Sequence, residues 1–244
     1  MYKQAGIVVR KVRIGNIVAN IYFEDINLPW LILLPGLPQY FHKQSYFQEL
    51  IKKYVVLTPY YPGSFHSYGE FKLNQLEEVI PKCFEFINKR EFYDFFESKL
   101  YKHSGKIEGI MGLSFGANLI LDYLNKNDVN KNIIFCLISP IFDMNNEKVE
   151  DYWNKKLGFL ATEVYTQIYK QLDIDELKKF FKQLTETKNS TNSNIFVIAG
   201  DGDKYVTKDF IKSYFPKARH HFFEGIGHEV DKLLELVLDN HIIF

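Results

Sequence analysis

Ser114 lies between two glycines in the stretch Gly112-Leu113-Ser114-Phe115-Gly116, which follows an apolar, strand-like run and precedes a helical pattern. This G-x-S-x-G spacing, in a strand–turn–helix context, indicates a nucleophile elbow, a sharp turn that presents a serine hydroxyl at its tip. The glycines have a steric reason, because the nucleophile must hold a strained backbone and side chains two positions away would clash. The stretch therefore predicts a nucleophilic serine.

A serine hydroxyl is a poor nucleophile near neutral pH and needs a base, normally an imidazole that a carboxylate orients. His228 is the best placed of the seven histidines, because it follows a predicted strand and the turn Gly225-Ile226-Gly227 and precedes a helix. Its ring would then lie over the carboxyl edge of the sheet. We expect His228 to act as the general base for Ser114.

Three aspartates could orient that imidazole. Asp201 and Asp203 both come just after the predicted strand Ile195–Ala199, where either could reach the ring. Asp143, past the preceding predicted strand, is a third candidate. Without a catalytic role, each would be a turn or capping residue, as aspartate commonly is.

Acyl transfer also needs hydrogen-bond donors for the oxyanion of the tetrahedral intermediate. The elbow supplies one of them, the backbone N–H of Phe115. The second is expected from the loop after an early strand, where Pro35-Gly36-Leu37 follows the apolar run Trp30–Leu34. We expect the N–H of Leu37 to be that donor.

Strand and helix patterns alternate along most of the chain. The β-rich runs Ile7–Ile14 and Ile17–Phe23 are joined by Gly15-Asn16, which predicts an antiparallel hairpin at one sheet edge. Further strands are expected before Gly112 and at Trp30–Leu34, Tyr54–Thr58, Asn132–Ile138, Ile195–Ala199 and Arg219–Phe223, and helices at Gln44–Lys53, Leu73–Phe96 (started or kinked by Pro81), Ala117–Leu124 and Glu229–Leu238. The pattern predicts an α/β fold with a mainly parallel, doubly wound sheet, which binds ligands beyond the carboxyl ends of its strands.

The segment Phe142–Ser193 breaks this alternation. It shows helical periodicity over Trp153–Tyr169 and Asp173–Leu184 and then a polar run, Thr185–Asn194, without a convincing strand. We interpret it as a small helical cap inserted over the active site, within a single domain that spans residues 1–244. The alternative is a crossover helix followed by a long loop, since parallel strands require a crossover in any case.

Taken together, these stretches resemble the α/β-hydrolase family over nearly the whole chain. The resemblance implies the family's fold, a Ser-Asp-His triad in that chain order and a mechanism without a cofactor. It favours Asp203 as the acid, because Gly200–Val206 is similar to the G-x-x-D segment, with a Val shortly afterwards, in which the family places that residue. The chain departs from the family at Pro35-Gly36, where His-Gly is common. Family members often carry a lid where Phe142–Ser193 lies.

The leading hypothesis is a serine hydrolase, an esterase in the first place, that cleaves a small carboxylic ester, thioester or amide through an acyl-enzyme. The aromatic residues Tyr40, Phe41, Phe65, Phe142 and Trp153 are expected around the carboxyl edge, where they would bind an apolar acyl or aromatic group. A serine peptidase or an acyltransferase could use the same triad. A non-catalytic binding protein could keep the same fold, although this chain retains every expected triad residue.

Composition narrows the classes of partner. Thirty basic and thirty acidic side chains cancel, so no overall field would draw the protein to nucleic acid or to an anionic membrane. Cys83 and Cys136 lie among apolar residues, as reduced core thiols do, and the first residues lack the apolar centre of a signal peptide. His220-His221 beside Arg219 lacks the spacing of a metal cluster. We expect a cytoplasmic enzyme that acts on a small molecule without a metal or cofactor.

Overall fold

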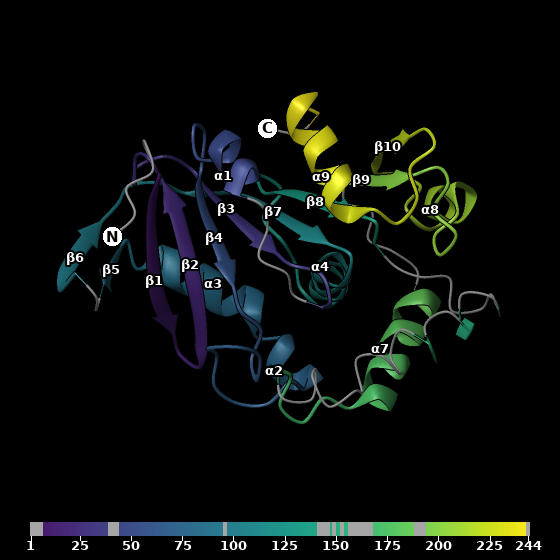
Figure 1. The fold of residues 1–244 in the computed structure, drawn as a ribbon, viewed down its shortest axis with the longest axis horizontal. Coiled ribbons are helices and arrows are strands. Elements are labelled where there is room, and N and C mark those ends of the chain that lie inside the picture. The colour runs from purple at the N-terminus through teal and green to yellow at the C-terminus, as the bar shows by residue number, and fades with distance from the viewer. Residues whose placement is uncertain are drawn as a thin grey trace.

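The computed structural model describes residues 7–38, 44–94, 97–140, 168–187 and 194–242, with the isolated positions 147, 150–151 and 154–155. These residues form an eight-stranded sheet with helices on both faces, and a separate two-stranded hairpin beside one edge (Figure 1). The predicted α/β class, with a mainly parallel sheet and an N-terminal antiparallel hairpin, is confirmed.

The large sheet has the strand order β1-β2-β4-β3-β7-β8-β9-β10. Its strands are β1 (Val8–Ile14), β2 (Ile17–Phe23), β3 (Trp30–Leu34), β4 (Val55–Pro59), β7 (Ile107–Leu113), β8 (Ile134–Ile138), β9 (Ile195–Gly200) and β10 (Arg219–Phe223). β1 and β4 both run antiparallel to β2, and from β4 to β10 neighbouring strands are parallel. The carboxyl ends of the parallel strands therefore meet at one edge of the sheet.

The central strands are buried on both faces, as their continuous apolar sequences predict. In β3, Ile32 and Leu34 face one core, whereas Leu31 and Leu33 face the other. The helices that pack in the first core are α2 (Leu73–Leu76), α3 (Val79–Asn88), α4 (Phe115–Lys126), α7 (Ile174–Glu186) and α8 (Lys208–Tyr214), and those in the second are α1 (Gln44–Leu50) and α9 (Val230–Asp239). Figure 1 shows α1 and α9 on one side of the sheet and α3 and α4 on the other. Within the described ranges, no helix is long and apolar enough to cross a lipid bilayer.

The helix predicted from residue 73 onward is confirmed in part, with Pro81 at the start of a helix, but it is not one continuous helix. The chain instead forms α2 and α3 and then the strand β5 (Glu91–Asp94), which pairs with β6 (Lys99–Lys102) in an antiparallel hairpin. Pro81 lies in the first turn of α3, where its missing N–H is tolerated. Phe92, between two exposed neighbours, packs edge-on against Trp30 with 6.5 Å between ring centroids. So short a strand has too few apolar residues to distinguish a helical period from a period of two.

The helix α8 was also missed in the sequence, where no element was predicted between β9 and β10. Thr207 begins this helix, because its side-chain oxygen accepts a hydrogen bond from the N–H of Phe210 at 3.2 Å. The helix has seven residues, of which Ile211 alone is fully buried. One buried residue leaves almost no amphipathic pattern for the sequence to reveal.

Part of the predicted insertion falls within the described residues. α7 coincides with the predicted helix Asp173–Leu184, and the carboxylate of Asp173 caps its first turn. Its apolar side packs against α4, with 6.2 Å between the ring centroids of Phe181 and Phe115. The pattern at Trp153–Tyr169 lies almost wholly outside the described residues, so that the cap itself stays a prediction.

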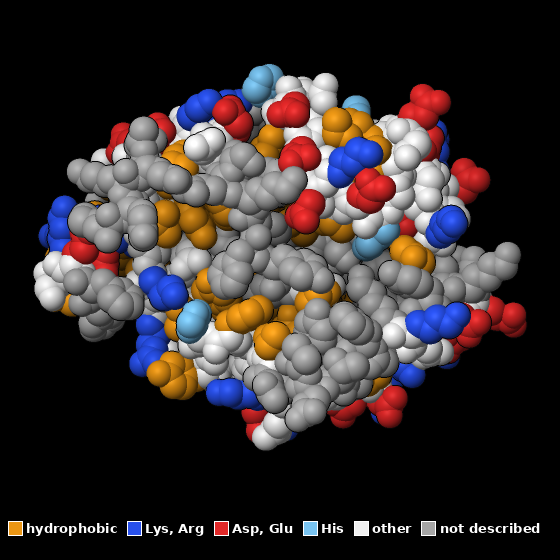
Figure 2. Space-filling model, in the orientation of Figure 1, with side chains coloured by type: hydrophobic (Ala, Val, Ile, Leu, Met, Phe, Trp, Pro, Cys, Tyr) orange, Lys and Arg blue, Asp and Glu red, His pale blue; other side chains and the backbone are white. Residues whose placement is uncertain are grey.

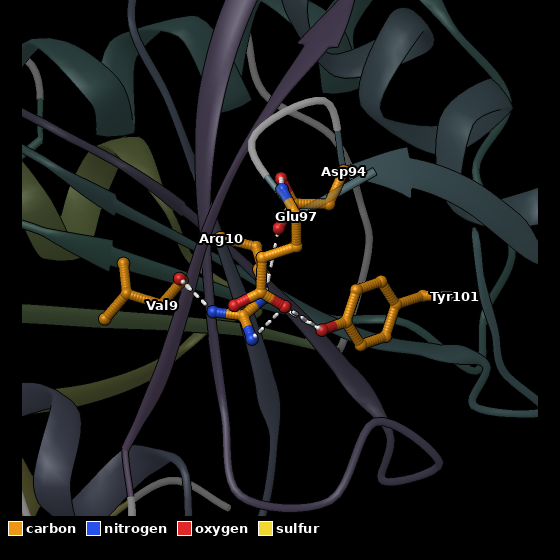
Figure 3. A network of polar contacts seen from close by, with 5 residues as sticks. All are labelled: Val9, Arg10, Asp94, Glu97 and Tyr101. Atoms are coloured by element: carbon orange, nitrogen blue, oxygen red, sulfur yellow. Dashed lines mark hydrogen bonds and ion pairs between the residues drawn. The ribbon is translucent and has the colours of Figure 1, made fainter. Parts of the chain in front are cut away.

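Arg10 on β1 holds the β5–β6 hairpin against the large sheet (Figure 3). Its guanidinium donates to Glu97 at 2.8 Å and to the hydroxyl of Tyr101 at 2.9 Å, and it lies 3.1 Å from the carboxylate of Asp94. The Tyr101 hydroxyl in turn donates to Glu97 at 3.0 Å. The side chain of Asp94 is only 2% exposed, so the guanidinium compensates a carboxylate that has little access to water.

We expect Arg10→Met to lower the free energy of unfolding by about 3 kcal/mol, because it leaves Asp94 buried without this cation while keeping an aliphatic stem. Thermal unfolding followed by circular dichroism should show a fall in Tm of about 6–12 °C for a chain of this size. Adding Asp94→Asn should recover part of that loss.

Lys52→Met is the matched control for Arg10→Met. It removes the ion pair of Lys52 with Glu49, whose side chains are 56% and 50% exposed, and should leave Tm nearly unchanged. A loss no larger in Arg10→Met than in this control would contradict the role given to Arg10.

Candidate active site

Ser114 forms the turn between β7 and α4. The strand ends at Leu113 and the helix begins at Phe115, so the serine alone separates them. Its backbone has φ 49° and ψ −108°, in a region that is costly for a residue with a side chain. Its N–H donates to the carbonyl of Ile138 on β8 at 2.8 Å, which ties the turn to the sheet. This is the geometry of a nucleophile elbow.

The two glycines of the motif are sterically required. A Cβ on Gly112 would lie 2.5 Å from the backbone nitrogen of Ala117, and a Cβ on Gly116 would lie 2.3 Å from the carbonyl oxygen of Leu34. Both contacts are with backbone atoms, which cannot move aside as a flexible side chain can. The glycines therefore allow the first turn of α4 to lie directly on β7 and on the end of β3.

His228 and Asp203 form a hydrogen-bonded chain with Ser114. The Oγ atom of Ser114 lies 3.2 Å from Nε2 of His228, and Nδ1 of the same ring lies 2.8 Å from Oδ2 of Asp203. With the ring proton on Nδ1, that nitrogen donates to the carboxylate and Nε2 accepts from the serine hydroxyl. The three residues follow β7, β9 and β10, so the shared carboxyl edge of the sheet brings them together. The arrangement allows the hydroxyl to pass its proton to the imidazole.

The two candidate acids, Asp201 and Asp203, differ in burial. Asp203 is 4% exposed, and its second carboxylate oxygen, Oδ1, accepts a hydrogen bond from the N–H of Tyr205 at 2.9 Å. Asp201 is exposed and accepts from the N–H of Gly225 at 2.8 Å, as a turn residue does. The structure thus places Asp203 rather than Asp201 against His228. The third candidate, Asp143, lies outside the described residues.

The two candidate oxyanion donors belong to segments that meet at Ser114. Phe115 is the first residue of α4, where backbone N–H groups have no partner within the helix. The loop of Leu37 follows β3, and a Cβ on Gly36 would lie 3.5 Å from Cβ of Ser114 and 3.3 Å from the carbonyl oxygen of Leu113. The loop therefore touches the elbow, with Pro35 and Gly36 in place of the common His-Gly pair.

Phe65 is the one predicted substrate-binding residue that the described ranges include. It follows β4, is half-buried, and packs on Tyr60 and Tyr169 with ring centroids 5.8 Å and 6.3 Å apart. Phe71 connects this cluster to the elbow, because its ring lies 4.9 Å from that of Tyr169 and 6.0 Å from that of Phe115. The other four predicted binding residues, Tyr40, Phe41, Phe142 and Trp153, lie outside the described residues.

Two tyrosines near the site were not singled out in the sequence. Tyr205 supplies the backbone N–H to Asp203, and its ring lies edge-on to the ring of His228 at 5.5 Å. Tyr61 follows β4 and donates its hydroxyl to the carbonyl of Pro35. Both follow predicted strands at their carboxyl ends, and this position is the signal that could have revealed them.

Neither described cysteine competes with the serine as a nucleophile, and the described residues contain no metal cluster. Burial raises the pKa of the Cys83 thiol to about 12 and raises the pKa of Cys136 as well, so neither forms a thiolate near neutral pH. Among these residues, no three His, Cys, Asp or Glu side chains are grouped so that they could hold a metal ion.

Comparison with known proteins gives a match at the level of structure. No protein-family model and no curated protein sequence matches the chain. A ferulic acid complex of Est1E from Butyrivibrio proteoclasticus matches it with a TM-score of 0.61 at 15% identity, over 94% of this chain and 95% of the other. Naproxen esterase from Bacillus subtilis matches with a TM-score of 0.59 at 12% identity, over 97% and 90%. The 2-hydroxy-6-oxo-6-phenylhexa-2,4-dienoate hydrolase of Rhodococcus sp. strain RHA1 matches with a TM-score of 0.57 at 11% identity, over 97% and 96%.

These likenesses extend over nearly the whole of both chains, so they concern the complete architecture and not a shared substructure. The protein has the α/β-hydrolase fold. At such low identities the likeness shows the fold alone, because one fold hosts many chemistries.

Proposed function

We propose that the protein is a serine hydrolase that cleaves a small carboxylic ester, thioester or amide through an acyl-enzyme, with esters as the leading class. The observation that carries the proposal is the continuous hydrogen-bonded chain from Ser114 through His228 to Asp203. This series of hydrogen bonds begins at Ser114, whose backbone is strained, and such strain is characteristic of functional sites.

In the proposed reaction, Nε2 of His228 takes the hydroxyl proton while Oγ of Ser114 bonds to the carbonyl carbon of the substrate. The carbonyl oxygen becomes an oxyanion, which the N–H groups of Phe115 and Leu37 stabilise. His228 then gives the proton to the leaving group as the bond between that group and the carbon breaks, and an acyl-serine is left. Water, deprotonated by the same imidazole, releases the acid and restores the serine, while Asp203 keeps the imidazole oriented.

For the acyl group we propose an apolar or aromatic acid. Naproxen esterase is named for one aromatic carboxylic acid, and Est1E was solved with another, ferulic acid. Phe65 lies in an aromatic cluster that reaches the elbow, and Tyr40, Phe41, Phe142 and Trp153 remain our further candidates for contacts with this group. Figure 2 shows hydrophobic side chains in the middle of the displayed face and charges of both signs around its rim.

We also propose a cytoplasmic location. Cys83 on α3 and Cys136 on β8 are both free, buried thiols, as is usual in a reducing compartment. The substrate would then be a small molecule of the cell interior.

A fluorophosphonate probe tests the proposal, because it reacts covalently with an activated serine. The folded protein should be labelled at Ser114, as located by peptide mass spectrometry, and should hydrolyse short-chain nitrophenyl esters. Ser114→Ala should lose both properties. Ser213→Ala, which removes an exposed hydroxyl on α8, is the control and should keep them. An unlabelled protein with no ester turnover above that of Ser114→Ala would show that the proposal is wrong.

A further inference from the structure

Tyr61 is buried between the two segments that carry the candidate oxyanion donors. It lies just after β4, its side chain is 0% exposed, and its hydroxyl donates to the carbonyl oxygen of Pro35 at 2.5 Å. Burial, with smaller contributions from Tyr169 and Cys83, raises the pKa of Tyr61 well above its ordinary value. The phenol therefore stays protonated and acts as a permanent donor to Pro35.

The carbonyl that Tyr61 holds lies against the elbow. A Cβ on Gly116 would lie 2.7 Å from the oxygen of Pro35, so this oxygen packs over the first turn of α4. One residue further on, Gly36 packs against the side chain of Ser114. Because a peptide group is planar, a fixed Pro35 carbonyl also fixes the plane that leads into Gly36. Few backbone torsions then separate that plane from the N–H of Leu37.

The ring of Tyr61 contacts the other donor segment. It lies edge-on to Phe115, with 5.5 Å between ring centroids and an interplanar angle of 83°, and it also packs on Phe71 at 6.2 Å. Phe115 is the residue whose backbone N–H is the first candidate donor. A single side chain therefore contacts the Leu37 loop through its hydroxyl and the Phe115 segment through its ring.

We propose that Tyr61 is a positioning residue for the oxyanion hole, and this inference rests on the proposed hydrolase function. Its hydroxyl holds the Pro35–Gly36 peptide so that the N–H of Leu37 faces Ser114 before substrate arrives. Donors that are in place beforehand stabilise the oxyanion without reorganisation, which is the source of their large effect on rate. The role suits a chain that has proline where the common His-Gly pair has its histidine.

Tyr61→Phe tests the proposal, because it removes the hydroxyl and keeps the ring that packs on Phe115. We expect kcat for a nitrophenyl ester to fall about 10–100-fold with KM nearly unchanged, since the loss of a whole oxyanion donor costs about 10²–10³. A boronic acid inhibitor forms a tetrahedral adduct on the serine and places an oxygen in the same hole. Its affinity should fall by a factor similar to that of kcat.

Stability provides the second measurement, because Tyr61→Phe also leaves the Pro35 carbonyl without its donor. Circular dichroism and thermal unfolding should show a folded protein with a Tm lower by several degrees, and rates are compared well below that Tm. Tyr101→Phe, which removes a hydrogen-bonded hydroxyl on β6 beside β1, is the control and should keep the kcat of the unaltered protein.

The possible outcomes separate this inference from the proposed function. If Tyr61→Phe is less stable but keeps the kcat and the boronic acid affinity of the unaltered protein, the tyrosine is merely structural and the inference is overturned while the function stands. If the unaltered protein shows neither turnover nor labelling of Ser114, both fail together. A selective loss of kcat and of boronic acid affinity in Tyr61→Phe supports both the positioning role of Tyr61 and the proposed function.

Discussion

His228→Ala is expected to lower kcat about 10⁶-fold, to the level left by binding and the oxyanion donors alone. In the proposed mechanism the imidazole of His228 accepts the Ser114 proton, across 3.2 Å. Because Ser114 and His228 act as a unit, the variant that lacks both should be no slower than either single variant. Steady-state kinetics on one nitrophenyl ester would compare Ser114→Ala, His228→Ala and the double variant.

His221→Ala is the matched control for His228→Ala. His221 is an exposed imidazole on β10, packed on Phe223 with 4.6 Å between ring centroids, and its loss should leave kcat unchanged. Additive losses in the double variant would contradict a shared proton transfer. A residual rate in His228→Ala within tenfold of the unaltered protein would assign the base to another group.

Asp203→Asn is expected to lower kcat by about 10⁴, with a much smaller effect on KM. An amide in place of the carboxylate can donate to Nδ1 of His228, which favours the ring tautomer whose proton sits on Nε2 and faces the serine. The substitution is nearly isosteric, so the N–H of Tyr205 can keep an oxygen acceptor and the fold should be retained. Circular dichroism would verify the fold, and ester kinetics would measure the loss.

Asp201→Asn provides the comparison, since the two aspartates are separated by one residue. Asp201 is exposed and accepts from the N–H of Gly225, a bond that an amide oxygen can also accept. The kcat of Asp201→Asn should therefore stay within a few-fold of that of the unaltered protein. The reverse pattern, a collapse in Asp201→Asn and activity in Asp203→Asn, would reassign the acid.

Much of the sheet could be predicted because its strands carry strong signals. β3 and β8 are continuous apolar runs that end at proline-containing turns, and β1 and β2 flank a Gly-Asn turn. The composition of the strands and the turn residues that follow them therefore indicate the same elements. In the hairpin β5–β6 the composition and the turn residues do not agree in this way. Phe92 follows an apolar helical run without a glycine or proline to separate them, and its pairing with Tyr101 on β6 is a contact that the local sequence pattern does not reveal.

The candidate site was predictable to the extent that it depends on chain order at strand ends. Ser114, Asp203 and His228 were chosen by their positions after predicted strands, and the structure brings the three side chains into hydrogen-bonding contact. The choice between Asp201 and Asp203 needed a family resemblance, because the sequence does not show which of two aspartates one residue apart is buried. The contact of Tyr61 with Pro35 was hidden for another reason, since it joins loops of two neighbouring strands through one hydroxyl.

The wide separation of the site residues along the chain has a consequence for folding. Ser114 and His228 are 114 positions apart, and β8 and β9 must both pair before the last strand can present the imidazole. Closing so long a loop costs entropy that is recovered only when the final parallel pairings form. Helices and single strand pairs can therefore exist in a refolding chain that has no active site. For the proposed hydrolase, the appearance of turnover would report the pairing of the strands from β7 to β10, whereas spectroscopic signals of secondary structure would report earlier stages.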